Sequence, residues 1–556
     1  MVASGNSEGH EPQALATITQ GSLTQGLEAR LNPGISVEEM RVGKFVVVRG
    51  HRNRFFGLLT DVALGSTSPQ ISIDPPQPHQ TFLSDVLAGT STFGTVSLVP
   101  MLMIVESTAS DGVELLPVKT IPAHFSQVFE AVDGDFHAVF GSESDRIHKN
   151  FAIGQPVDMS VPVCINLDRF VERSNGIFGK SGTGKSFLTR LLLSGVIRRQ
   201  AAVNLIFDMH SEYGWEAATE GHSTNTVKGL KQLFPSQVQI YTLDPESTQR
   251  RGVRDALELF ISYGQIEVED LALLRDEINI SEASLENAVI LRNEFGRDWI
   301  SRLMSMSNSD IQEFCEQRMG HKASMMALQR KLTRLEDLPY LRPVVPHNYI
   351  NRILESLEAG KHVVIEFGAQ ANMLSYMLAS NIITRRIHQA YVLKAERYLH
   401  SKNPADKPRQ LMIVIEEAHR FLAPQTVKQT IYGTIAREMR KYFVTLLVID
   451  QRPSGIDSEV MSQVGTRITA LLNDDKDIDA VFTGVSGSQN LRTILAKLDS
   501  KQQVMILGHS VPMPVVVRTR PYDERFYAEM GEMDWSNAAD DEVKLAAELA
   551  RAELGL

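Results

Sequence analysis

Cysteine is nearly absent from this sequence of 556 residues, and its scarcity excludes two classes of protein. The only two, Cys164 and Cys315, lie far apart and form no CxxC or zinc-ligand spacing. Two cysteines in so long a chain fit a reducing cytoplasm better than a disulfide-stabilised scaffold. We therefore expect a cytoplasmic protein that is neither disulfide-rich nor built around a cysteine metal site.

Long apolar runs are missing as well. The longest stretches, such as Val96–Val105, fall well short of the roughly 18 residues that a membrane-spanning helix needs. The first ten residues lack the basic segment followed by an apolar segment that marks a secretory signal. No association with a membrane is therefore expected.

An excess of positive charge is the third feature that the sequence lacks. There are 56 Lys and Arg residues against 67 Asp and Glu residues, which gives a net charge of −11. Such a chain does not coat nucleic acid by bulk attraction, although a local basic channel could still hold DNA. Residues 523–556 hold ten acids and three bases, so we expect an acidic tail there, with a weakly amphipathic helix over residues 542–554. Residues 1–14 are small and polar, and we expect them to be flexible.

Short β-rich runs separated by Gly, Pro and Ser occupy residues 15–165. The clearest are Lys44–Val48, Phe55–Asp61, Gln70–Ile73, Val96–Val105 and Val113–Lys119. Strands this short and this regularly spaced predict a small barrel or sandwich. The segment Ile153–Val163 is interpreted as the exit strand and linker of this unit.

Strand–helix alternation begins after Asn166 and continues to about Tyr522, which is typical of a parallel α/β sheet. The expected strands are Gly176–Phe178, Val203–Phe207, Val238–Thr242, His362–Glu366, Leu411–Ile415, Val444–Asp450 and Val504–Leu507. Residues 245–360 instead carry apolar residues at helical spacing and predict a helical insertion. The expected helices there are Val253–Phe260, Val268–Arg275, Leu285–Phe295 and one or more over Asn308–Leu338, and a long helix runs from Asn372 toward Leu399.

The strongest functional motif is a glycine-rich loop over residues 179–186 that fits G-x-x-x-x-G-K-[ST]. It follows an apolar run and leads into a helical segment, as a P-loop requires. Its backbone N–H groups would cradle phosphate oxygens, Lys185 would reach the β- and γ-phosphates of ATP, and Ser186 would bind Mg²⁺. The expected nucleotide-binding residues are Gly179, Lys180, Ser181, Gly182, Thr183, Gly184, Lys185, Ser186 and Phe187.

Two adjacent carboxylates follow the apolar run Leu411–Ile415. The strand predicts a buried central position, and open α/β sheets bind ligands at the carboxyl ends of their strands. Glu416 is expected to hold the Mg²⁺ ion, and Glu417 is expected to polarise the attacking water. A simple acidic helix start is the structural alternative. We interpret His419, two residues later, as a structural histidine.

Polar residues at other strand ends are weaker candidates. Gln451, after Val444–Asp450, could contact the γ-phosphate or its water, although Pro453 also favours a plain turn here. Asp208 could contact the metal's water or could cap a turn.

Arg437 and Arg440 end the helix that precedes the strand of Gln451, and their spacing puts them on one helix face. Either could be an arginine finger that reaches the ATP of a neighbouring subunit. Cations at a helix C-terminus also simply complement the helix dipole.

Together these motifs resemble those of the HerA family in the HerA–FtsK branch of P-loop ATPases. The matching segments are GKSGTGKS (179–186), FDMHSEY (207–213), IEEAHRF (415–421), AREMRKY (436–442) and DQRPS (450–454). The sequence departs from the family pattern at Tyr442-Phe443, where a small residue is common, and at Glu416, where Asp is usual. The resemblance and the motifs predict an α/β P-loop (RecA-like) ATPase core with a helical insertion, preceded by a small N-terminal β-barrel.

The resemblance implies a hexameric ring that moves double-stranded DNA at the expense of ATP, with a partner nuclease of the NurA type in DNA end resection and repair. The residues themselves indicate one ATPase core, which an oligomer with an arginine supplied in trans would complete. Two alternatives remain: a ring ATPase that is a scaffold for a defence effector enzyme, and an ATPase of the conjugation or secretion kind. The sequence contains neither the LSGGQ signature of transporter ATPases nor the NKxD motif of GTPases.

Overall fold

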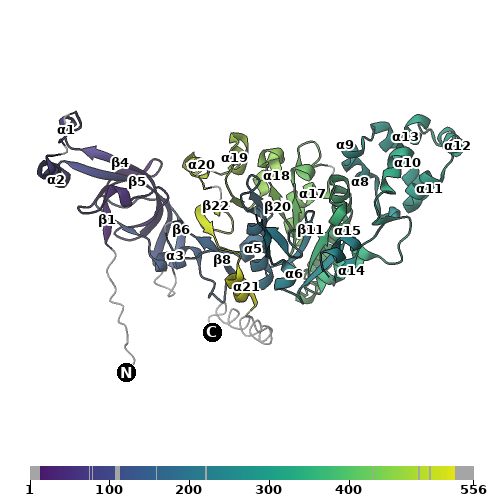
Figure 1. The fold of residues 1–556 in the computed structure, drawn as a ribbon, viewed down its shortest axis with the longest axis horizontal. Helices are drawn as coiled ribbons and strands as arrows, with labels where there is room; N and C mark the ends of the chain where they lie inside the picture. The colour runs from purple at the N-terminus through teal and green to yellow at the C-terminus, as the bar shows by residue number, and fades with distance from the viewer. Residues whose placement is uncertain are drawn as a thin grey trace, which may run out of the picture.

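The computed structural model is an elongated molecule whose three parts lie in a row (Figure 1). A β-rich unit forms one end, an α/β core lies in the centre, and a group of short helices forms the other end. The structure describes residues 13–531, except 74, 78, 107–112, 158, 220–221, 254, 429, 486–488, 497 and 500–501. The helix expected over residues 542–554 and nearly all of the flexible segment expected over residues 1–14 lie outside the described residues.

The N-terminal strands form an antiparallel sheet that closes into a barrel. Its members are β1 (Ala14–Ser22), β2 (Gly26–Leu31), β3 (Phe45–Arg49), β4 (Arg54–Ser66), β5 (Thr92–Glu106), β6 (Val113–Pro117) and β7 (Gln127–Glu130). Their order is β2-β1-β7-β3-β4-β5-β6, and β2 also pairs with β5, so the sheet closes on itself and β6 extends it from β5. Closure removes unpaired strand edges. The expected small N-terminal barrel is confirmed.

The side chains of β3 alternate between two hydrophobic cores. Val46 and Val48 belong to the core inside the barrel. Phe45 points the other way and packs edge-on against Phe136 of α3 (Asp133–Phe140), with ring centroids 5.2 Å apart. This outer face belongs to the same hydrophobic cluster as one side of the central sheet. Because successive side chains of a strand face opposite sides, one short strand both fills the barrel and attaches it to the α/β core.

A long hairpin projects from the barrel and carries two helices at its tip (Figure 1). Strands β4 and β5 stay paired as far as Ser66 and Thr92, and α1 (Pro69–Ile73) and α2 (Thr81–Thr90) connect them. The prediction of a strand over Gln70–Ile73 was wrong, because these residues belong to α1. Pro69 occupies the first helical position, where its fixed φ favours a helix, and so short an apolar run does not distinguish strand from helix.

A twelve-stranded mixed sheet forms the core. Its order is β15-β14-β18-β11-β19-β20-β10-β21-β22-β23-β8-β9. The parallel strands are β10 (Asn175–Phe178), β11 (Val203–Asp208), β14 (Val238–Thr242), β15 (Leu257–Glu258), β18 (His362–Glu366), β19 (Leu411–Glu416), β20 (Val444–Asp450) and β21 (Thr466–Thr469). The antiparallel strands are β8 (Asn150–Gln155), β9 (Val163–Asn166), β22 (Gln503–Gly508) and β23 (Val515–Thr519). The α/β fold class is confirmed, and each expected core strand is present within about one residue at either end.

Strands β8 and β9 pair with the large sheet, although the expected barrel unit extended to residue 165. β8 lies beside β23, with Gly154 opposite Thr519 and Gln155 opposite Arg518. The barrel sheet itself ends with β7 at Glu130. Local β-propensity cannot reveal which sheet a strand joins when its partner lies so far away in the chain.

Helices cover the core sheet and build the far end of the molecule (Figure 1). Those around the sheet are α4 (Leu167–Val171), α5 (Lys185–Arg198), α6 (Leu230–Leu233), α14 (Tyr349–Glu358), α15 (Met373–Ser401), α16 (His419–Leu422), α17 (Ile431–Glu438), α18 (Ser458–Gln463), α19 (Asp475–Val481), α20 (Gln489–Ala496) and α21 (Glu524–Gly531). The long helix expected after Asn372 is α15, whose first turn is capped by the Asn372 side chain. Among the described residues, no helix has both the length and the apolarity needed to cross a membrane.

The helical insertion is largely as expected but begins differently. Its helices are α7 (Pro245–Arg250), α8 (Val268–Leu273), α9 (Arg275–Ile278), α10 (Glu282–Phe295), α11 (Trp299–Ser305), α12 (Asn308–Arg318) and α13 (Lys322–Leu332). The expectation of a helix over Val253–Phe260 was wrong, because Leu257 and Glu258 form β15 at the edge of the sheet. Two further short strands, β16 (Ile261–Ser262) and β17 (Leu341–Arg342), pair with each other. Apolar residues at helical spacing do not predict that these two segments, which are far apart in the chain, pair as strands.

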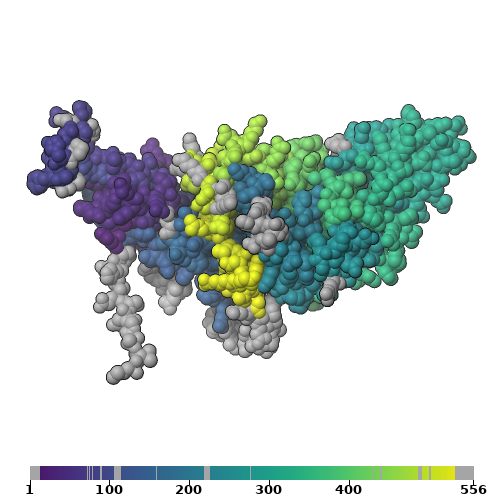
Figure 2. All heavy atoms as spheres, viewed as in Figure 1, coloured from purple at the N-terminus to yellow at the C-terminus, as the bar shows by residue number. Residues whose placement is uncertain are grey.

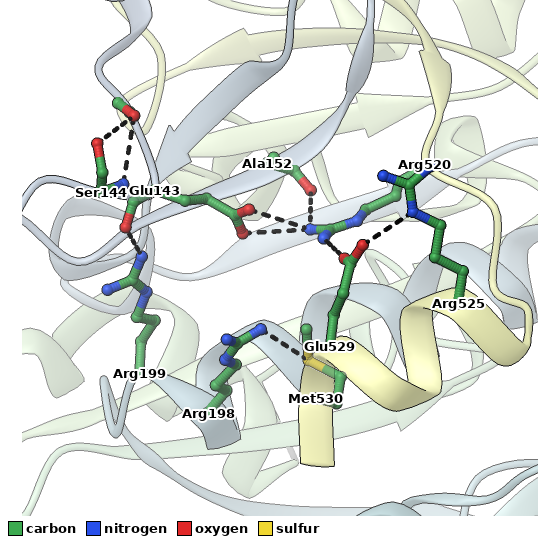
Figure 3. Close-up of polar contacts among 10 residues, drawn as sticks. Glu143, Ser144, Ala152, Arg198, Arg199, Arg520, Arg525, Glu529 and Met530 are labelled. Carbon is green, nitrogen blue, oxygen red and sulfur yellow. Dashed lines mark hydrogen bonds and ion pairs between the residues drawn. The ribbon is translucent and has the colours of Figure 1, made fainter. Parts of the chain in front are cut away.

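The end of the described chain packs over the junction between barrel and core (Figure 2). Arg520 lies between two carboxylates in the close-up of this region: its guanidinium contacts Glu143, which follows α3, and Glu529 of α21 (Figure 3). The same side chain donates to the backbone oxygen of Ala152 in β8, 3.4 Å away. Arg520 therefore ties the end of the described chain to the segment that contains Glu143 and Ala152, which lie 377 and 368 positions away from it.

Candidate functional site

The glycine-rich loop lies at the carboxyl end of β10, between the ends of β20 and β21. It leads directly into α5, whose N-terminal residue is Lys185. Gly182 and Gly184 have φ angles of 76° and 85°, in the left-handed region that glycine adopts without strain. A Cβ on Gly179 would lie 2.8 Å from the Thr183 hydroxyl and 2.9 Å from Ala470, so this position also leaves no room for a side chain.

Lys185 is held against its own loop. Its Nζ donates to the backbone oxygen of Lys180 at 2.9 Å, and the Thr183 hydroxyl donates to the same oxygen at 2.8 Å. These contacts fold the loop over the start of α5, where backbone N–H groups and the helix dipole favour an anion.

A cavity of about 150 Å³ opens in front of this loop. The expected site residues that line it are Ser181, Gly182, Gly184, Lys185, Ser186, Phe187, Glu416, Glu417 and Gln451. Gly179, Lys180 and Thr183 shape the loop behind the cavity without lining it. The tertiary structure thus gathers residues from three separated motifs.

The strand order explains this gathering. β20 lies between β10 and β19, and all three strands are parallel. Parallel strands bring their carboxyl ends to one edge of a sheet. Gln451, directly after β20, therefore stands between the P-loop and the carboxylates that end β19.

Glu416 is buried at the end of β19, and only one of its two carboxylate oxygens has a hydrogen-bond partner among the described residues. Its Oε1 accepts a hydrogen bond from the Tyr213 hydroxyl at 2.7 Å. Its Oε2 has no hydrogen-bond partner among the described residues. Burial, and after it the nearby Asp208 carboxylate, raise the pKa of Glu416 to about 8.

The donor set fits a magnesium ion bound together with a nucleotide. Glu416, whose Oε2 is unpartnered, and Ser186 both line the same cavity. Mg²⁺ is usually held by one or two protein oxygens, with phosphate and water completing its shell. In the part of the chain that the structure describes, no group of three or more His, Cys, Asp or Glu could hold a metal on its own.

Glu417 differs from Glu416 in exposure and in backbone conformation. Its side chain is part-exposed, and its φ of 48° lies in the left-handed region, which is uncommon for a residue with a Cβ. Its Oε2 lies 3.6 Å from Nδ1 of His419. A water beside the cavity could therefore reach this carboxylate.

Residues that sequence reasoning missed surround the two carboxylates. Tyr213 supports Glu416, and Asp450, the last residue of β20, binds His419. Glu366 ends β18, which β11 separates from β19, and pairs with Arg251. The sequence could have indicated Asp450 and Glu366, because each ends a predicted strand at the ligand-binding edge of the sheet.

Asp208 is a buried turn cap in the structure. Its carboxylate accepts hydrogen bonds from the backbone N–H groups of Glu212, Tyr213 and Gly214 at 2.7, 2.8 and 3.0 Å. These bonds shape the loop that presents Tyr213 to Glu416. Asp208 does not line the cavity.

Arg437 does not line the cavity in front of the P-loop of its own chain. Arg437 lines a different cavity of about 550 Å³, together with Thr445 near the start of β20 and Arg467 near the start of β21. This cavity lies at the opposite edge of the parallel strands. The Arg437 guanidinium is 3.9 Å from Glu459. Arg440 follows α17 in the 3-10 turn Met439–Tyr442, and its side chain lies outside the described set.

Comparison with known proteins gives matches along most of the chain. The family described as "Helicase HerA, central domain" matches residues 151–387, and the "HAS barrel domain" matches residues 15–116. A protein of Sulfolobus acidocaldarius named "DNA double-strand break repair helicase HerA" is 22% identical over 513 residues, which cover 91% of this chain and 94% of the relative. The Pyrococcus furiosus protein of the same name is 22% identical over 444 residues, covering 74% and 76%.

Among solved structures, the bacterial conjugative coupling protein TrwB is 12% identical to this chain with a TM-score of 0.44. The match covers 70% of this chain and 92% of TrwB.

Proposed function

This chain belongs to the HerA helicase family, and we propose that it is an ATP-driven translocase of double-stranded DNA. In this proposal several copies form a ring, most simply a hexamer, that acts with a nuclease of the NurA type in DNA end resection and repair. The name that the relatives share, which refers to double-strand break repair, supports the proposal. The chain itself is an ATP hydrolase of the P-loop class.

One observation carries the assignment of the site: the P-loop lysine, two consecutive carboxylates and a glutamine line a single cavity. We assign Lys185 to the β- and γ-phosphates, which requires its Nζ to leave the Lys180 oxygen. Ser186 and Glu416 would hold Mg²⁺, which when bound neutralises charge on the phosphate oxygens. Glu417 would take up the proton of the attacking water, and Gln451 would orient that water or the γ-phosphate.

A ring could add an arginine finger from a neighbouring copy. Among the described residues, Arg190 is the only arginine that lines the cavity, and its guanidinium is bonded to the backbone oxygen of Glu212. Arg437 lies at the edge of the sheet opposite the P-loop, so a head-to-tail contact between copies could bring it to the nucleotide of a neighbour. Native mass measurement with and without ATP and duplex DNA tests this assembly. A protein that stays monomeric under all these conditions would contradict the ring.

The P-loop assignment is tested by Lys185→Ala and Glu417→Gln. Lys185→Ala should abolish ATP turnover, because the transferred phosphate loses its main positive contact. Glu417→Gln should still bind ATP but hydrolyse it about a hundredfold or more slowly, because only water activation is removed. Lys322→Ala, on α13 of the helical insertion, is the matched control and should retain full activity.

Turnover at the wild-type rate in Lys185→Ala would refute the assignment of the nucleotide site. Loss of ATP binding in Glu417→Gln would show that this carboxylate supports the fold of the site instead of the chemical step.

A further inference from the structure

Asp450 joins two segments of the nucleotide site that are separate in sequence. Its carboxylate is buried at the end of β20 and accepts the backbone N–H of His419 at 2.6 Å and the backbone N–H of Arg452 at 2.7 Å. Nδ1 of His419 lies 3.0 and 3.1 Å from its two oxygens. A single carboxylate thus holds the start of α16 against the turn that follows β20.

These two segments carry the residues assigned to the attacking water. Glu417 precedes His419 by two positions, and Gln451 directly follows Asp450. Both line the cavity in front of the P-loop. The pair between His419 and Asp450 therefore connects the residue proposed to activate the water with the residue proposed to orient it.

The backbone at this point needs such a connection. Glu417 has a left-handed φ of 48°, a conformation that costs free energy for a residue with a Cβ and persists only where surrounding contacts impose it. His419 supplies two of these contacts through its backbone N–H and its ring. The Cβ of His419 also packs closely against Gly455, where an added Cβ would lie 3.2 Å from it.

The electrostatic surroundings agree with this role. Nδ1 of His419 lies 3.0 Å from Asp450 and 3.6 Å from Oε2 of Glu417, so the ring stands between two carboxylates. The hydrogen bond to Asp450 is the main reason why the pKa of His419 is raised, whereas burial and, more weakly, Arg420 oppose this rise. An Nδ1–H that donates to Asp450 leaves Glu417 without a direct bond to the ring, so that its carboxylate stays available to a water.

We propose that His419 and Asp450 are positioning residues that fix Glu417 relative to Gln451 in front of the transferred phosphate. This inference rests on the proposed function and adds two residues to it. Asp450 lines the cavity, but its carboxylate is already bonded to His419 and to the backbone N–H of Arg452. In this proposal the pair acts through Glu417 and Gln451 and not on the phosphate. It therefore affects the rate of the chemical step and not the binding of the nucleotide.

The test compares His419→Ala, His419→Asn and Asp450→Asn with the wild-type protein. An Asn side chain can still donate a hydrogen bond to Asp450 from about the position of Nδ1, whereas Ala cannot. His419→Ala should lower kcat by about ten- to a hundredfold, the scale of a small misplacement of a reacting group. The Kd of a non-hydrolysable ATP analogue should change by less than about twofold, because the substitution leaves the groups that bind the nucleotide in place. His419→Asn should recover most of kcat.

A double-mutant cycle separates positioning from general stability. If His419 acts through Glu417, adding His419→Ala to Glu417→Gln should lower kcat by no more than about twofold further, because the group to be positioned is already lost. His321→Ala is the matched control, since the ring of this histidine likewise makes a hydrogen bond at the start of a helix, but in the insertion, where it accepts from the Ser324 N–H. Thermal unfolding of each variant accompanies the kinetic measurements.

Three results would overturn the inference: an unchanged kcat in His419→Ala, multiplicative losses in the double variant, or parallel losses of nucleotide affinity and melting temperature that His419→Asn does not repair. Failure of the proposed function looks different. In that case the wild-type protein and His321→Ala would themselves not hydrolyse ATP, and the inference would fall with it.

Discussion

The hydroxyl of Tyr213 donates a 2.7 Å hydrogen bond to Oε1 of Glu416, and both side chains are buried. Tyr376 of α15 holds the backbone of Glu416. The Tyr376 hydroxyl accepts a hydrogen bond from the Glu416 N–H at 2.8 Å and donates one to the Glu416 backbone oxygen at 3.1 Å. Glu416 is thus fixed from two sides, and only Oε2 remains for a ligand in the cavity. This geometry suits a carboxylate that holds a metal ion in one orientation.

Tyr213→Phe should therefore weaken the use of magnesium. The Tyr213 hydrogen bond lowers the pKa of Glu416, so its loss favours the protonated carboxyl, which is a poor metal ligand. Leaving a buried oxygen without its donor costs about 1–3 kcal/mol. We expect the Mg²⁺ concentration for half-maximal ATPase activity to rise by at least about fivefold, which corresponds to about 1 kcal/mol, the lower end of that range.

The measurement is a Mg²⁺ titration of the ATPase rate at saturating ATP. Tyr241→Phe is the matched control, because this tyrosine is buried too but bonds Ser356 away from the cavity. Identical Mg²⁺ dependence in Tyr213→Phe and Tyr241→Phe would contradict the prediction.

Arg251→Met should destabilise the protein mainly at alkaline pH. Burial and Asp208 raise the pKa of Glu366 to about 7, and the Arg251 guanidinium opposes that rise. A carboxyl whose pKa is raised in the folded state makes folding less favourable as the pH rises. The loss of stability begins near pH 4.5, the ordinary pKa of the carboxyl, and continues through the folded-state pKa. Without Arg251 the folded pKa rises further, so the variant continues to lose stability above pH 7.

The melting temperatures of Arg251→Met and wild type should accordingly lie close together near pH ~6 and separate near pH ~8.5, where an unpaired buried charge costs about 3–5 kcal/mol. Arg250→Met provides the control, since Arg250 is the exposed neighbour at the end of α7. A difference in melting temperature that is independent of pH would show that Arg251 acts by packing alone.

An arginine supplied in trans should be detectable by mixing inactive subunits. Lys185→Ala chains and Arg437→Ala chains are each expected to be inactive alone, but mixed rings contain some interfaces with an intact lysine and an intact arginine. ATPase activity should therefore reappear on mixing. Arg440→Ala is tested in parallel, because spacing on α17 and the turn after it does not choose between the two arginines. No recovery in rings that have demonstrably exchanged subunits would count against the mechanism.

Binding of duplex DNA should require the assembled ring and should fall steeply with salt. A chain with a net charge of −11 gains little from bulk attraction, whereas basic side chains from several copies can add their phosphate contacts inside one channel. Duplex affinity and DNA-stimulated ATPase activity, measured from roughly 50 to about 300 mM salt, should decline together. Salt-insensitive binding, or monomers that bind as tightly as rings, would favour a scaffold over a motor.

Local sequence determined the strands and the chemistry that they carry. Apolar runs bounded by polar residues fixed the position of β14, β18 and β20 to the residue, and a glycine-rich loop with a helix behind it permits little besides phosphate binding. These signals are local, because a strand or a P-loop needs only its own residues to be recognised. The predictions for Gln70–Ile73 and Val253–Phe260 were wrong, because so few residues fit the period of a strand and the period of a helix equally well.

Only the tertiary structure decided which residues meet. The placement of β20 between β10 and β19 brings Gln451 beside Glu417, and the turn capped by Asp208 carries Tyr213 to Glu416. The pairing of β8 with β23, and of Arg251 with Glu366, likewise joins segments far apart in the chain. No local pattern encodes such contacts, because strand order and buried ion pairs are set by how the whole sheet excludes water and satisfies its polar groups.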